Sequence, residues 1–238
     1  MRLSILSFIS LIYLFYTQSS KEQNLNESTC KSEKENILKK EKEMYMNYQY
    51  KVNSFSVTNI QALQIIGILE QFRPNNIIEY GTGITTDIFE FYCEKYNKNL
   101  LTIEHSTKYQ RESSVLFKLN FKGNVVIDDV KYKNTNIYEG LEDFFKSYKK
   151  KFDFVLIDAP HGEKKTYKYG RIQMIDLLVF DLLEDEGYFL IHNTEKPSVK
   201  NSLEVLLTLF KQKHYKIKME VLGYKKYKQL TIIHFIKQ

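Results

Sequence analysis

Residues 76–87, with the sequence NIIEYGTGITTD, constrain the fold of this chain more than any other segment. Ile77 and Ile78 end a short apolar run, as a buried strand does, and from Ile84 onward apolar residues recur at helical spacing. The glycines between them let the backbone approach a ligand, and the helix start directs unpaired N–H groups into the same space. The segment predicts a strand, a glycine turn and a helix that bind a nucleotide-like cofactor. A tight turn that binds no ligand is the alternative.

An acid follows this turn at an informative distance. Residues 100–104 predict a second strand that ends in Glu104, which lies 21 residues after Gly83. A carboxylate that binds the ribose hydroxyls follows a glycine turn at a spacing of roughly 20 residues. Glu79, just before the turn, would repel a pyrophosphate but suits a cofactor with a cationic amino-acid end. We therefore expect Glu104 to bind a ribose.

The Glu-x-Gly-x-Gly turn and the acid after the second strand resemble the class I S-adenosylmethionine-dependent methyltransferases. The resemblance covers residues 58–238. It implies that S-adenosylmethionine is the cofactor, with Glu79 at its amino end and Glu104 at its ribose. It also implies that Asp129, after an expected third strand, contacts the adenine amine, and that the turn residues Gly81, Thr82 and Gly83 contact the cofactor.

The rest of the chain alternates between expected helices and strands. We expect helices from Thr58 to before Pro74, from Ile84, and over 108–120, 142–148, 171–183 and 198–213. We expect the remaining strands over 125–130, 152–158, 187–192, 215–222 and 229–236. Such alternation predicts an α/β fold with a doubly wound, mostly parallel sheet. The short turn between the last two strands predicts an antiparallel C-terminal hairpin, which completes the seven-stranded, Rossmann-like sheet of class I methyltransferases.

Ligands bind beyond the carboxyl ends of the strands in such a sheet. Three of the five histidines in the chain follow predicted strand ends, at His105, His161 and His192. Asp158 and Asn193 stand beside two of them. Histidines at successive strand ends favour a functional site at this edge over chance polar loops.

The run Asp158-Ala-Pro-His161-Gly, followed by Gly170-Arg171, resembles the plant glucuronoxylan 4-O-methyltransferases over about 40 residues. Ile172 replaces their methionine, and His192-Asn193 stands where they have His-Asp. Those enzymes are Golgi-anchored. An arginine at position 171 can bind a substrate carboxylate in bidentate fashion. Pairing with Asp176 or capping of a loop is the alternative for this arginine.

A hydroxyl acceptor must be aligned with the activated methyl group and must lose a proton. Histidine titrates near neutral pH, so His161 is the first candidate for the general base. Asp158 would polarise it or bind the acceptor, His192 is the second candidate, and Arg171 and Asn193 are candidates for binding the acceptor. Metal-dependent methyltransferases of this topology use a second acid where this chain has His192, so a divalent metal is doubtful and no metal ligand is assigned.

The N-terminus is expected to be a targeting segment. Residues 1–20 combine a basic start, an uncharged stretch over 3–16 and small residues at the exit, as a secretory signal peptide does. The uncharged stretch is shorter than the roughly 20 residues of a membrane span. An uncleaved signal anchor and a buried helix are the alternatives. Residues 21–50 are expected to be a polar stem with a glycosylation sequon at Asn26, and residues 51–238 the methyltransferase-like domain.

Composition excludes several classes of partner. The chain has 35 Lys and Arg against 29 Asp and Glu, and its lysines are scattered, whereas a nucleic-acid-binding protein concentrates them in a stripe. Two cysteines make a disulfide framework unexpected, and no Cys and His spacing fits a zinc site.

We therefore expect an S-adenosylmethionine-dependent O-methyltransferase of the ER or Golgi lumen, or a secreted one, that acts on a carbohydrate or another small hydroxyl compound. A secreted, catalytically inactive protein with the same fold is one alternative, favoured by Asn193. An NAD-dependent reductase is the other, and the missing third glycine and Glu79 argue against it.

Overall fold

The computed structural model describes residues 57–127, 129–160, 168–224 and 227–238. They belong to one of two compact units of the chain, Val52–Gln238. The expected signal segment, the polar stem, Asn26 and His161 lie outside the described residues. Within the described ranges, no helix has the length and apolar character needed to cross a membrane.

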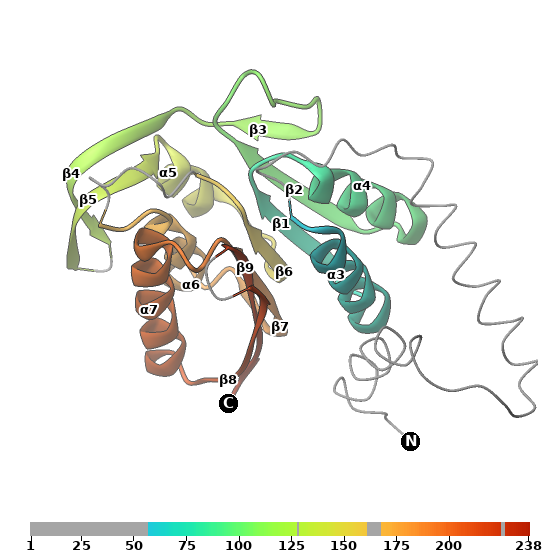
Figure 1. Ribbon diagram of the computed structural model, residues 1–238. Coiled ribbons are helices and arrows are strands. Elements are labelled where there is room, and N and C mark those ends of the chain that lie inside the picture. The colour runs from blue at the N-terminus through green and yellow to red at the C-terminus, as the bar shows by residue number, and fades with distance from the viewer. Residues whose placement is uncertain (1–56, 128, 161–167, 225–226) are drawn as a thin grey trace, which may run out of the picture. The chain divides into compact units, whose positions relative to one another are not determined.

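The main sheet has seven strands in the order β3-β2-β1-β6-β7-β9-β8 (Figure 1). The pairs along β3, β2, β1, β6 and β7 are parallel, whereas β9 runs antiparallel to both β7 and β8. The expected doubly wound sheet with an antiparallel C-terminal hairpin is therefore confirmed. The strands are β1 (Asn76–Tyr80), β2 (Asn99–Glu104), β3 (Ser114–Leu116), β6 (Phe152–Ile157), β7 (Leu183–His192), β8 (Tyr215–Tyr224) and β9 (Tyr227–Lys237).

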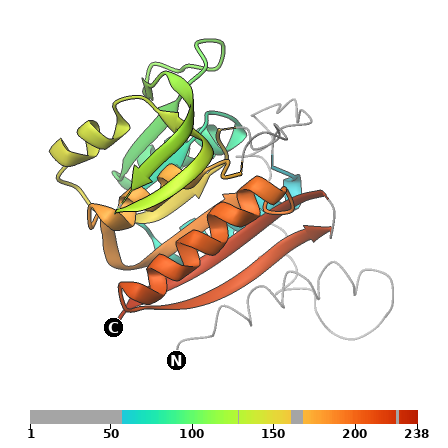
Figure 2. The same ribbon diagram turned by 90° about the vertical axis from the view of Figure 1, so that its left-hand side faces the viewer.

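Helices cover both faces of this sheet. On one face lie α3 (Asn59–Phe72) and α4 (Ile84–Tyr96), and Phe89 of α4 packs edge-on against Phe154 of β6 with 5.6 Å between ring centroids. On the other face lie α5 (Leu141–Ser147), α6 (Asp176–Val179) and α7 (Pro197–Gln212). Figure 2 shows α7 running along β8 and β9, where Phe210 stacks on Phe235 at 5.6 Å. Burial on both faces explains why β6 is buried throughout.

The start of α3 follows the local signal. Thr58 is the N-cap: its hydroxyl accepts from the backbone N–H of Gln61, and its own N–H donates to the Gln61 side chain at 2.9 Å. This reciprocal capping satisfies two of the backbone donors that a helix start leaves unpaired. The Gln61 amide nitrogen also donates to the carbonyl of Lys228, 2.5 Å away, so the cap joins α3 to the start of β9.

Two predictions between β2 and α5 are wrong. The expected helix over 108–120 is replaced by a turn and β3, and the expected third strand over 125–130 is part of an antiparallel hairpin of β4 (Leu119–Ile127) and β5 (Val130–Tyr138). The hairpin forms a separate two-stranded sheet beside α5 (Figure 1). In β4, Leu119, Phe121, Val125 and Ile127 lie at alternate positions and share one face, as strand geometry requires. Asp129 therefore lies in an exposed hairpin turn with φ of +61°, and not at the end of a sheet strand.

The expected helix over 171–183 is also wrong in extent. A 3₁₀ turn (Ile172–Ile175) and the four residues of α6 replace it, and β7 already begins at Leu183. Leu183 pairs with Phe152 at the start of β6, and the carbonyl of Leu182 accepts from Phe152 N at 2.7 Å. A continuous apolar run fits a buried helix and a buried strand equally well. Here the pairing with β6 makes the end of the run a strand.

Candidate functional site

The two glycines of the turn after β1 have different surroundings. Gly81 has φ of +94°, and a Cβ placed on it would lie 2.6 Å from Cβ of Ala159, in the loop after β6. Gly83 caps the start of α4, and a Cβ there would meet no atom within 4 Å. Gly81 is therefore required for packing of the turn, whereas Gly83 borders open space beside the first turn of α4, where unpaired helix N–H groups point.

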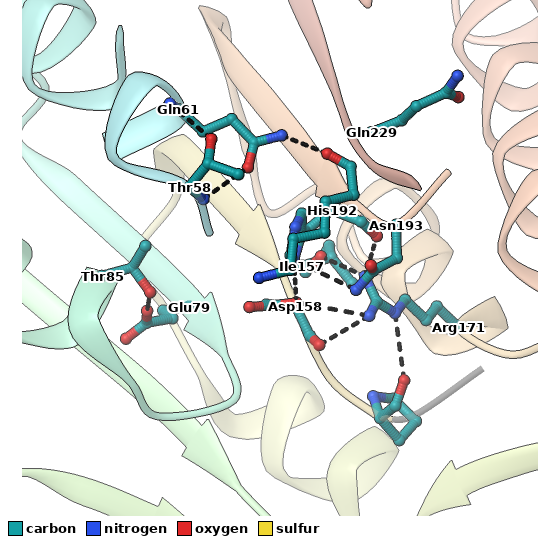
Figure 3. Close-up of polar contacts among 12 residues, drawn as sticks. Thr58, Gln61, Glu79, Thr85, Ile157, Asp158, Arg171, His192, Asn193 and Gln229 are labelled. Atoms are coloured by element: carbon teal, nitrogen blue, oxygen red, sulfur yellow. Dashed lines mark hydrogen bonds and ion pairs between the residues drawn. The ribbon is translucent and has the colours of Figure 1, made fainter. Parts of the chain in front are cut away.

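Glu79, at the end of β1, is fully buried. The hydroxyl of Thr85, from the first turn of α4, donates to its Oε1 atom (Figure 3), and the Thr102 hydroxyl lies 3.4 Å from Oε2. Burial raises the pKa of Glu79 to about 8, because desolvation outweighs the hydrogen bonds from Thr85 and Thr86. Glu79 is therefore protonated at neutral pH until a cation approaches it.

Glu104, at the end of β2, is 3% exposed and fully hydrogen-bonded. Oε1 accepts from the backbone N–H groups of His105 and Ser106 at 2.7 and 2.8 Å, and Oε2 accepts from Thr82 N at 2.8 Å. Burial alone would raise the pKa of this carboxyl. Hydrogen bonds from the His105 side chain and from these backbone groups outweigh burial and lower the pKa to about 2. Glu104 is therefore a carboxylate at any physiological pH.

The hydroxyl of Thr82 lies between two acceptors. Its Oγ1 atom is 2.8 Å from Oε2 of Glu104 and 2.6 Å from the carbonyl oxygen of Tyr109. A threonine hydroxyl has one proton and can donate to only one of them at a time. When it donates to Tyr109, one acceptor position on Glu104 becomes available for a ligand hydroxyl.

A second cluster lies where β6 and β7 end (Figure 3). Nδ1 of His192 is 2.7 Å from Oδ1 of Asp158, and the amide nitrogen of Asn193 is 3.2 Å from the same ring atom. His192 and Asn193 are buried, whereas Asp158 is partly exposed. The sheet therefore brings three of the predicted site residues into contact at one edge.

Arg171 is buried directly behind this cluster. Its guanidinium donates to four backbone carbonyl oxygens, those of Ile157 and His192 at 2.6 Å, Asp158 at 2.7 Å and Pro160 at 3.2 Å. This geometry favours the loop-capping alternative over the substrate clamp, because four of the five N–H donors are already used and the side chain is 1% exposed. Desolvation lowers the pKa of Arg171.

The structure brings Glu79, Gly81, Thr82, Gly83 and Glu104 together on one half of the carboxyl edge, and Asp158, His192 and Asn193 on the other. It does not bring Asp129 to either half. The sequence pattern does not identify Tyr138, which reaches the edge from β5 with its ring 6.0 Å from that of His105. Its hydroxyl and that of Tyr80 are buried without a hydrogen-bond partner among the described residues. No local signal identifies Tyr138, because tertiary packing places the hairpin.

The cluster does not fit a divalent metal. Among the described residues, no group of three or more His, Cys, Asp or Glu side chains is placed to hold one. One oxygen of Asp158 is bound to His192, whose Nδ1 atom faces that carboxylate and not an open position.

No protein-family model matches this chain, and no curated protein matches it. Solved structures do match. The O-methyltransferase from Bacillus cereus in complex with SAH superposes with a TM-score of 0.52 at 14% identity, over 93% of this chain and 96% of that one. Cofactor-bound Rv0187 from MTB superposes with a TM-score of 0.53 at 10% identity, over 79% of this chain and 84% of that one. At such identities the likeness shows the fold, which is the Rossmann-like methyltransferase fold.

Proposed function

We propose that this protein is an S-adenosylmethionine-dependent O-methyltransferase. The observation that carries the proposal is the glycine turn between β1 and α4, with Glu79 before it and Glu104 beside it, on a sheet of methyltransferase strand order. The SAH complex of the Bacillus cereus protein, which shares this fold, supports the same choice of cofactor.

The residues of this half-site fit the cofactor. S-adenosylmethionine supplies a methyl group already activated by its sulfonium. Gly83 leaves room for it beside the first turn of α4. Glu79 offers a buried carboxyl whose ionised form a cationic amino group would stabilise, with release of the proton to solvent. Glu104 accepts from a ribose hydroxyl once Thr82 turns toward Tyr109.

The acceptor is proposed to be a hydroxyl compound, and a glycan is the specific candidate. The local resemblance of residues 158–171 to the plant glucuronoxylan 4-O-methyltransferases motivates the glycan. The acceptor would bind beside Asp158 and Asn193, at the half of the edge that faces away from Glu104. The signal-like residues 1–20 motivate a place in the secretory pathway, with anchoring through residues 3–16 as a further proposal. The expectation from the sequence that His161 is the general base concerns a residue outside the described ranges.

A binding protein without catalysis is the second candidate, and one observation favours it. Every acceptor position of Glu104 has a donor within the chain, so the carboxylate is stable without a ligand. In that case Glu104 would serve only to hold the turn against β2.

Calorimetric titration of S-adenosylmethionine and S-adenosylhomocysteine into the full chain tests the proposal. A Gly83→Phe variant blocks the open space, and Gly123→Phe is its matched control, because Gly123 also has no atom within 4 Å of its Cβ position and lies in β4. We expect micromolar binding that Gly83→Phe abolishes and Gly123→Phe retains. Absence of binding by the folded wild-type protein would contradict the enzyme and leave the binding protein.

A further inference from the structure

Asp158 and His192 are in direct contact but differ in their access to solvent. Their closest atoms, Oδ1 and Nδ1, are 2.7 Å apart, and the side chains are 19% and 0% exposed respectively. Nε2 of His192 is buried and has no hydrogen-bond partner among the described residues. A molecule that enters at this edge of the sheet therefore meets Asp158 first.

The contact determines which nitrogen of His192 carries the proton. A carboxylate oxygen only accepts, so Nδ1–H must donate to Asp158. The amide nitrogen of Asn193, also a donor, is 3.2 Å from Nδ1 and cannot donate to it in that state. In the neutral ring Nε2 is then the unprotonated nitrogen, and it points into the protein.

The other groups around Asp158 leave one of its oxygens available. Nη2 of Arg171 lies 3.6 Å from Oδ1 and donates to the backbone carbonyl of the same residue. Glu79 and Tyr138 interact with Asp158 electrostatically from β1 and β5. Among the described residues, none donates a hydrogen bond to Oδ2, and the printed contacts of the carboxylate are made through Oδ1.

We propose that Asp158 is the catalytic residue that accepts the proton of the acceptor, and that the buried His192 is a positioning residue that acts through Nδ1–H. The inference rests on the proposed function and assigns roles within that site. In the step, the acceptor oxygen forms a bond to the methyl carbon as the carbon–sulfur bond breaks. The bonding pair returns to sulfur, and the acceptor proton moves to Oδ2 of Asp158. The products are a methyl ether, a neutral thioether and a neutral carboxyl.

The hydrogen bond from His192 has two effects on this step. It holds Oδ1 of the carboxylate in place, and it leaves Oδ2 as the oxygen that takes the proton. Nη2 of Arg171 lies near the same Oδ1 atom, at 3.6 Å. A neutral histidine suits the role, because Nδ1–H donates whether or not the acceptor is bound.

Two substitutions separate the proposed role from that of a histidine base. His192→Asn places a donor near the position of Nδ1 and has no equivalent of Nε2, whereas His192→Leu removes both nitrogens. The NMR chemical shift of the Asp158 carboxyl carbon in full-length protein at neutral pH reports on this contact without cofactor or acceptor. We expect it to change in His192→Leu and to stay near the wild-type value in His192→Asn.

Two further NMR measurements test the geometry directly. We expect the ring nitrogens of wild-type His192 to report a proton on Nδ1, and a soluble gadolinium chelate to broaden the carboxyl carbon of Asp158 more than the ring carbons of His192. An unprotonated Nδ1, stronger broadening of His192, or equal chemical shifts of the Asp158 carboxyl carbon in the two variants would overturn the proposal. Calorimetry with S-adenosylhomocysteine on the same samples reports separately on the proposed function, since failure to bind would leave the NMR results unchanged.

Discussion

Thr82 and Glu104, 22 residues apart in the chain, are joined by two contacts of 2.8 Å, from N and Oγ1 of Thr82 to the same oxygen, Oε2. The first contact fixes the glycine turn against the end of β2. The second is exchangeable, because the hydroxyl can turn to Tyr109. The same carboxylate can therefore hold the turn and still accept from a ribose.

This relationship predicts that two substitutions change cofactor affinity to different extents. Thr82→Val removes only the exchangeable contact, so S-adenosylhomocysteine should bind within about threefold of wild type. Glu104→Gln places an amide group against N–H donors and should weaken binding at least tenfold, or about 1.4 kcal/mol. Calorimetry measures both. Equal losses of affinity in the two variants would show that the Thr82 hydroxyl does not turn away from Glu104 when the ligand binds.

The lowered pKa of Glu104 predicts acid sensitivity. The folded-state value of about 2 lies below the ordinary 4.5, so the carboxylate contributes stability that is present above pH 4.5 and is lost as the pH falls toward 2. The contribution is at most about 3 kcal/mol. Urea unfolding of wild type and Glu104→Gln between pH 2 and 5 should show two curves that converge in acid. Parallel curves over this range would contradict the assignment.

The raised pKa of Glu79 predicts the opposite slope. With a folded-state value of about 8, the native protein retains a proton that the unfolded chain releases above pH 4.5, so stability declines between pH 4.5 and 8. Glu79→Gln should flatten this decline and be more stable than wild type at pH 8, by roughly 2 kcal/mol or more. Urea unfolding at several pH values measures the slope.

Glu79 also predicts proton release when the cofactor binds. A cationic amino group beside this carboxyl would ionise it at pH 6.5, where the free protein retains the proton. Calorimetry with S-adenosylhomocysteine in two buffers of different ionisation enthalpy should detect the released proton. Glu79→Gln should show no such release. Release of equal size in that variant would place its source at another group.

Arg171 is predicted to act on stability. Its guanidinium donates to four backbone carbonyls. A lysine ammonium cannot place its donors in the same planar arrangement. Arg171→Lys should lower the free energy of unfolding by about 3 kcal/mol in urea titrations, because it leaves buried carbonyls unpaired. A variant of wild-type stability with weakened acceptor binding would instead support the substrate clamp.

Gly81 is predicted to be intolerant of any side chain. A Cβ atom would lie 2.6 Å from that of Ala159, and φ of +94° is itself unfavourable for alanine. Gly81→Ala should destabilise the protein by about 2 kcal/mol or more, as measured by thermal unfolding. Gly67→Ala, in the interior of α3 with no atom within 4 Å, is the control and should be stabilising by about 0.5 to 1 kcal/mol.

Short sequence patterns predict the structure correctly where the interacting residues lie close together in the chain. The helix start at Thr58, the turn at Gly81 and the antiparallel final hairpin involve residues close in sequence, and all three are as expected. The prediction for the region between β2 and α5 is wrong, because residues 125–130 do not join the main sheet. They belong to the hairpin of β4 and β5, whose strands pair only with each other.

Sequence by itself determined the sheet, its carboxyl edge and the identity of most polar side chains there, because strand period and glycine position are encoded within short segments. Only the tertiary structure decided what those side chains do. Arg171 satisfies carbonyls from two separate segments, 157–160 and His192, and His192 is buried while Asp158 is partly exposed. The burial of His192 and the use of the Arg171 donors by backbone carbonyls depend on residues distant in the chain. No residue spacing within one segment therefore predicts them.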